Sequence, residues 1–200
     1  MADNPHGFNP VKHKLGVPLS ATINPYYKAA AYGTGLFIGD AVVKAGSANT
    51  AVVFDGAETY GAGMLPDLNA SGTGGPITGV MVGKSTRSGN LATVHSPADT
   101  EDVILVCDDP FVVFSAQEDS GGGNIAAASI GLNTEIVLGA GNATTGISGH
   151  EIDSSAVATT ATLAVKILRL APDHGNAIGA NAEYWVTMNR HTEGDNIAGV

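Results

Sequence analysis

The apolar residues of this chain come in short stretches, and turn-forming residues interrupt each stretch before a long helix could form. Glycine occurs 27 times and proline nine times in the 200 residues. Both disfavour a helix interior, because glycine loses more backbone entropy on folding and proline removes a backbone donor. No helical periodicity extends beyond two turns. The chain is therefore expected to build its core from strands.

Ten stretches have the β-branched and aromatic content of strands, and Gly, Pro, Asn or Asp residues bound them. They cover residues 36–38, 40–44, 51–54, 77–83, 102–107, 111–117, 135–138, 150–153, 162–170 and 183–190. Only residues 124–130 favour a helix, and two turns at most fit there before Gly131.

Two of these stretches carry a more detailed pattern. In residues 183–190, the side chains of Tyr184, Val186 and Met188 fall on one face of the predicted strand. In residues 162–170, the alternation slips by one residue at Leu168, which predicts a β-bulge or burial on both faces.

We therefore predict an all-β fold, a β-sandwich or β-barrel with long Gly-rich loops and at most one or two short helices. Residues 1–31 contain four prolines and are expected to form an extended N-terminal arm. The β-rich domain is placed at 32–191, with a possible variable outer loop at 48–76, and a C-terminal tail at 192–200.

The surface of the protein is predicted to be poor in charge and acidic. Charged residues make up 14% of the chain, against roughly 25% in an ordinary soluble domain. Such a surface suits close contact with another protein, although a compact monomer would share this composition. The 19 acidic and 9 basic residues give a net charge of −10, and no run of basic residues occurs. We expect neither nucleic acid nor a membrane as a partner.

The chain offers little that could form a metal site. Cys107, the only cysteine, lies in an apolar run and is expected to be buried. The six histidines are scattered without metal-binding spacing and are interpreted as surface or interface groups. The acidic pairs 108–109 and 118–119 bracket one predicted strand, so they should lie at its opposite ends. We predict no metal and no cofactor.

No catalytic motif is complete. Gly83-Lys84-Ser85 lacks the preceding glycine that a phosphate-binding loop needs, because Thr78 occupies that position. Ser148 lacks the second glycine of a nucleophile elbow, because His150 takes its place. The protein is predicted not to be an enzyme.

Several segments together resemble the small head-decoration (cement) proteins of tailed bacteriophages. They are residues 4–8 (NPHGF), 37–43 (FIGDAVV), the long block 108–133, 153–170 with its DSS, TAT and ILRL motifs, and 178–191. The likeness is one of motif order over most of the chain.

This resemblance implies a structural protein on the outer capsid surface, where it bridges subunits of the phage major capsid protein. Copies of itself, as a dimer or trimer, are further expected partners. No apolar signal segment opens the chain, so we expect synthesis in the cytoplasm of the host bacterium and assembly into the virion. The residues expected at the capsid or subunit interface are Pro5, His6, Phe8, Pro10, Tyr26 and Tyr27.

Two alternative functions also fit the sequence. One is a phage tail-tube or fibre-associated structural subunit. The other is a carbohydrate-binding β-sandwich on the virion surface, which would use aromatic platforms. Candidate platforms are Tyr26, Tyr27, Tyr32, Tyr60 and Trp185, although Trp185 is expected in the core because its strand is apolar.

Overall fold

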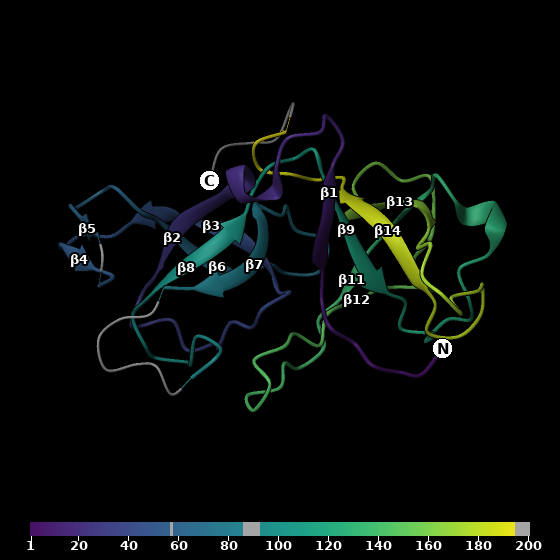
Figure 1. Cartoon of the computed structure of the whole chain (residues 1–200), viewed down its shortest axis with the longest axis horizontal. Coiled ribbons are helices and arrows are strands. Elements are labelled where there is room, and N and C mark those ends of the chain that lie inside the picture. Colours follow the sequence, from purple (N-terminus) through teal and green to yellow (C-terminus); the bar gives the residue numbers. More distant parts are fainter. Residues whose placement is uncertain (57, 86–92, 195–200) are drawn as a thin grey trace.

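The computed structural model of the protein describes residues 1–56, 58–85 and 93–194. Over these residues the fold is all-β, as predicted. The two short helical elements there are the 3-10 helices η1 (Leu19–Thr22) and η2 (Ala127–Ser129). None of the helices described is long and apolar enough to cross a membrane. The molecule is elongated, and its two lobes lie along the long axis (Figure 1).

The first lobe is a closed five-stranded barrel. Its strands are β2 (Ile23–Lys28), β3 (Ala41–Ala48), β6 (Pro66–Ala70), β7 (Gly79–Lys84) and β8 (Asp102–Cys107). They follow the order β2-β6-β3-β7-β8, and all neighbours are antiparallel except β2 and β6. One core cluster contains Tyr26, Leu36, Val42, Leu68, Met81, Ile104 and Val106.

The second lobe is a five-stranded antiparallel sheet. Its strands are β1 (Asn9–His13), β9 (Val112–Gln117), β10 (Asn133–Thr134), β13 (Val165–Leu170) and β14 (Glu183–Met188), in the order β1-β9-β14-β13-β10. The pairing of β13 with β14 shifts register between Ile167 and Arg169, at the point where the alternation slips, in keeping with the first of the two predicted causes. Tyr184, Val186 and Met188 share one buried core cluster, as the alternation predicts.

A continuous apolar core joins the two lobes. Val80 of β7 and Cys107 of β8 pack in the same cluster as Phe114 of β9 and Tyr184 of β14. Strand β8 therefore buries side chains toward both lobes, which explains its unbroken apolar run. Cys107 is a free, buried cysteine as predicted, and burial raises the pKa of its thiol.

Residues 1–31 do not form a detached arm. Strand β1 pairs with β9, from Asn9 opposite Ser115 to His13 opposite Val112, and β2 closes the barrel. The prolines that suggested an arm are tolerated because β1 is an edge strand and β2 pairs with β6 only at Tyr27.

The N-terminal segment approaches the barrel closely just before β1. Gly7 has a φ of +71°, and a Cβ on it would lie 2.5 Å from the carbonyl oxygen of Gly39. The next residue, Phe8, donates its backbone N–H to the same oxygen at 2.9 Å. A side chain at position 7 would therefore separate these two segments.

The predicted outer loop at 48–76 is only partly a loop, because residues 66–70 form barrel strand β6. The preceding part carries a small hairpin, β4 (Val53–Phe54) and β5 (Thr59–Tyr60), which lies at one end of the long axis (Figure 1). A second two-stranded ladder joins β11 (Ile136–Val137) and β12 (Glu151–Ile152). Of the predicted tail, residues 195–200 lie outside the described residues.

Candidate functional site

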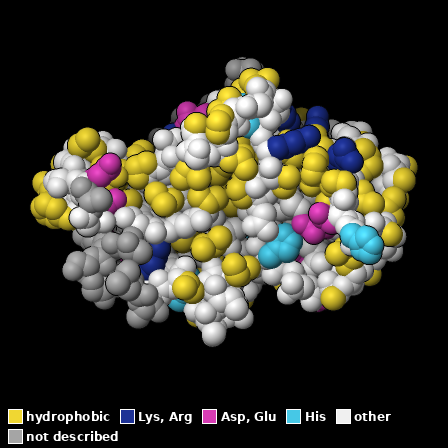
Figure 2. Space-filling model, viewed as in Figure 1, with side chains coloured by type: hydrophobic (Ala, Val, Ile, Leu, Met, Phe, Trp, Pro, Cys, Tyr) yellow, Lys and Arg dark blue, Asp and Glu magenta, His cyan; other side chains and the backbone are white. Residues whose placement is uncertain are grey.

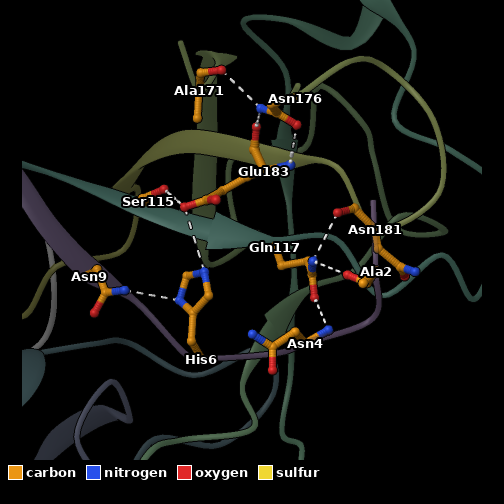
Figure 3. Close-up of polar contacts among 10 residues, drawn as sticks. All are labelled: Ala2, Asn4, His6, Asn9, Ser115, Gln117, Ala171, Asn176, Asn181 and Glu183. Atoms are coloured by element: carbon orange, nitrogen blue, oxygen red, sulfur yellow. Dashed lines mark hydrogen bonds and ion pairs between the residues drawn. The ribbon is translucent and has the colours of Figure 1, made fainter. Parts of the chain in front are cut away.

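The N-terminal residues are fastened to the second lobe by one amide side chain (Figure 3). Gln117, at the end of β9, accepts a hydrogen bond from the backbone N–H of Asn4 at 2.9 Å. Its Nε2 donates to the carbonyl oxygens of Ala2, at 3.0 Å, and Asn181, at 2.9 Å. Gln117 is buried, so these bonds compete with little water and hold the segment against the sheet.

A second contact holds the same segment a few residues further on (Figure 3). The side-chain amide of Asn9 donates to Nδ1 of His6 at 3.0 Å, which leaves Nε2 as the protonated ring nitrogen. That nitrogen lies 3.6 Å from Oε1 of Glu183, and the same carboxylate accepts from the hydroxyl of Ser115. These groups orient the segment, because one carboxylate oxygen of Glu183 lies against both the hydroxyl of Ser115 on β9 and the imidazole of His6.

The six residues expected at an interface divide into two groups. Pro5, His6, Pro10 and Tyr27 are half-buried, whereas Phe8 and Tyr26 are buried. Phe8 packs in the core shared by the lobes, and the hydroxyl of Tyr26 donates to Asp108 at 2.7 Å. Both rings are turned inward, Phe8 just before β1 and Tyr26 on β2, so neither ring is open to a partner in this structure.

Exposed apolar side chains gather instead where β1 meets the loop before β9. They are Val11, Leu15, Val17 and Phe111, which we call the apolar crest. Leu15 is 71% exposed. The backbone N–H of Lys14 donates to the carbonyl oxygen of Phe111 at 3.0 Å, which fixes the two parts of the crest together. The sequence did not single out this group, because Phe111 is distant along the chain from the other three members.

A second exposed apolar group lies around the β4–β5 hairpin. Its members, Val52, Phe54 and Met64, are called the apolar tip. Phe54 is 60% exposed, and Figure 2 shows hydrophobic side chains at this end of the molecule. The buried Asn49 supports the tip, since its Nδ2 donates to the carbonyl oxygens of Ala51 and Gly61. These two hydrogen bonds fix the backbone on either side of the β4–β5 hairpin.

A cavity of about 430 Å³ lies where the loop after β11 approaches the barrel. Asp40 and His150 line it, and Oδ1 of Asp40 lies 3.4 Å from Nε2 of His150. Nδ1 of His150 accepts the backbone N–H of Ala41 at 3.2 Å. Because this bond occupies the second ring nitrogen, His150 cannot also take a proton from a serine in this arrangement. The pair has the residue types of a catalytic Asp–His dyad but lacks a free ring nitrogen that could serve as the base.

Three of the six histidines are not the surface or interface groups that the sequence predicted. His13, His150 and His191 are buried, and in each of them Nδ1 accepts a backbone N–H. The donors are Leu15, Ala41 and Glu193. Burial lowers the pKa of His150 and of His191, so both rings are held neutral. Each of these three side chains therefore stabilises the local backbone by accepting a hydrogen bond from it.

The acidic pairs lie at opposite ends of β9, as predicted, and serve local structure. Asp109 lies 3.2 Å from Nε2 of His13, and Asp119 accepts from both the backbone and the hydroxyl of Ser154. Within residues 1–56, 58–85 and 93–194, no group of three or more His, Cys, Asp or Glu side chains is placed to hold a metal ion.

No protein-family model matches the chain, and neither a curated protein nor a solved structure matches it.

Proposed function

We propose that the protein decorates the outer surface of a bacteriophage capsid and stabilises it by bridging major capsid subunits. The observation that carries this proposal is the presence of two separate exposed apolar groups on one connected body. The crest lies by β1, near the middle of the long axis, and the tip lies with β4 and β5 at one end (Figure 1). A body with two separated contacts can dock on two subunits at once.

The energetics favour such a clamp. Each Å² of apolar surface removed from water contributes about 25 cal/mol before the costs of association are subtracted. A few exposed side chains therefore give only a modest gain at one position. Simultaneous contacts raise the effective concentration of the second contact, so a bridging protein binds more strongly than either contact alone.

The low charge of the surface supports the same proposal. Charged residues make up only 14% of the chain, so few ions need to lose their hydration when the surface meets another protein. The net charge of −10 opposes contact between this protein and packaged DNA or between neighbouring virions.

None of the five aromatic residues considered for sugar binding is fully exposed. Tyr26 is buried, and the ring of Trp185 has the cations of Lys12 and Arg169 above it. A sugar stacks on an open aromatic face, so these positions do not favour a glycan-binding function.

Expanded capsid shells that lack decoration provide the direct test. Purified protein should co-sediment with them and saturate at repeated lattice positions seen by cryo-microscopy. Leu15→Asp and Phe54→Asp should each lower the occupancy, because each puts a charge into an apolar contact. Ile178→Asp is the matched control, since Ile178 is 47% exposed and belongs to neither group. Absence of saturable binding, or equal losses in the control, would contradict the proposal.

A further inference from the structure

The fold brings together basic residues that lie far apart in the sequence. Lys12 and Lys14 come from β1 and the residue after it, and Lys166 and Arg169 come from β13. Contacts with β14 place all four on one face of the second-lobe sheet, which we call the basic face. Figure 2 shows Lys and Arg side chains gathered on the side where β13 and β14 lie. The sequence, which has no basic run, gave no sign of this.

Trp185 lies at the centre of the basic face. Trp185 was expected in the core, but its ring is only half-buried. The neighbouring Tyr184 takes the inward position on β14 instead. Nζ of Lys12 lies 4.7 Å from the ring centroid, and Cζ of Arg169 lies 5.0 Å from it. Strands β1 and β13 lie on opposite sides of β14 in the sheet. The ring therefore holds two cations in place.

The other two cations extend the face along the sheet. Nζ of Lys14 donates to the hydroxyl of Thr187 at 3.2 Å, and Lys166 lies opposite Thr187 in the pairing of β13 with β14. Burial and then the charge of Lys166 lower the pKa of Lys14. The two lysines therefore repel one another, and a bound anion would offset this repulsion.

Carboxylates of the chain itself do not neutralise this face. Within the described residues, no salt bridge joins Lys12, Lys14, Lys166 or Arg169 to an acidic side chain. The next acidic group along β14, Glu183, is bound by Ser115 and faces His6. The chain has 19 acidic residues, yet none of those in the described part forms a salt bridge with these four cations.

We propose that the basic face binds an acidic segment of a partner protein. Arg and Lys side chains match carboxylates in both charge and hydrogen bonding, and the half-buried indole adds an apolar surface between them. Single-stranded nucleic acid is less well suited, because its bases stack on open aromatic faces and cations already lie over this ring. The proposal does not rest on the capsid function.

The single tryptophan makes the test direct. Trp185 is the only tryptophan of the chain, so its fluorescence reports on this face alone. Titration with a short polyglutamate peptide should change this fluorescence saturably, and added salt should weaken the binding. The double variant Lys12→Gln, Arg169→Gln should weaken it about tenfold or more, as loss of complementary charges does. Both side chains are exposed, and circular dichroism will confirm that the variant is folded.

The matched control is Lys44→Gln, which removes a barrel lysine that pairs with Glu193. It should leave the peptide affinity unchanged. The proposal is overturned if the peptide does not saturate the signal, or if the control weakens binding as much as the double variant. Equally tight binding of a single-stranded oligonucleotide would overturn the choice of partner. The choice of partner would also be overturned if sedimentation showed that the wild-type protein self-associates and that the double variant does not.

Discussion

Asp40 and His150 face one another where the barrel meets the ladder of β11 and β12, with Oδ1 and Nε2 3.4 Å apart. Asp40 immediately precedes β3, and His150 immediately precedes β12. The other carboxylate oxygen accepts the backbone N–H of Phe37 at 2.8 Å, and the other ring nitrogen accepts that of Ala41. Because both side chains also bind backbone, the pair fixes two loops that are distant in sequence.

The first prediction concerns the pH dependence of this pair. Burial lowers the pKa of His150 below its usual value of about 6.5, although the charge of Asp40 opposes the shift. The folded state then binds fewer protons than the unfolded state, so the stabilisation is present above about pH 6.5 and lost as the pH falls. Urea denaturation should show that His150→Gln flattens the fall in unfolding free energy between about pH 7 and 5. His174→Gln, at an exposed position, should retain the wild-type slope.

The second prediction has the opposite sign. Burial, with the charges of Asp3 and Asp119, raises the pKa of Glu151 to about 7. The folded state keeps a proton that the unfolded state releases, so this stabilisation is complete below about pH 4.5 and is lost as the pH rises through 7. Glu151→Gln should therefore raise the unfolding free energy at pH 8 relative to wild type more than at pH 5. Asp173→Asn is the exposed control, and an equal change at both pH values would contradict the assignment.

The third prediction concerns a lysine that is fully buried at the end of β2. Nζ of Lys28 donates to the carbonyl oxygens of Pro97, at 2.7 Å, and Thr100, at 2.9 Å. Lys28→Met would leave both oxygens without this donor and should lower the unfolding free energy by about 3 kcal/mol. Chemical denaturation measures this loss. Lys44→Met, which removes a more exposed lysine, should cost less than about 1 kcal/mol.

The strands that were predicted most accurately from the sequence are those with mostly buried apolar side chains. Residues 102–107 form β8 over the predicted range, and the slip at Leu168 appears as a register shift. Strand β6 was missed because residues 66–70 include Pro, Asp and Asn, which are rare in strands, and only Leu68 is buried among them. Its hydrogen bonds come from closure of the barrel, which depends on distant partners and leaves no local pattern.

The candidate sites were harder to predict for the same reason. Phe8 and Tyr26 were expected at an interface, but both are buried by long-range pairing, Phe8 with Gly39 and Tyr26 with Ile104. The basic face requires β1 to lie beside β9, so that Lys12 reaches Trp185. Charge clustering of this kind arises from long-range pairing and cannot be read from neighbours in the chain.

The last prediction uses two glycines of one strand, β7, as a matched pair. A Cβ on Gly79 would lie 2.3 Å from the carbonyl oxygen of Cys107, whereas a Cβ on Gly83 would meet only Leu105 at 3.8 Å. Gly79→Ala must therefore push β7 away from β8 and should lower the unfolding free energy by about 2–4 kcal/mol. Gly83→Ala should stay within about 0.5 kcal/mol of wild type.

The thiol of Cys107 gives an independent measurement of the same displacement. It is the only cysteine and is 1% exposed, so a thiol reagent reaches it only when the barrel opens. Labelling under native conditions should be faster in Gly79→Ala than in wild type, and unchanged in Gly83→Ala. Equal labelling rates and equal stability in the two variants would mean that β7 and β8 are not in close contact at Gly79.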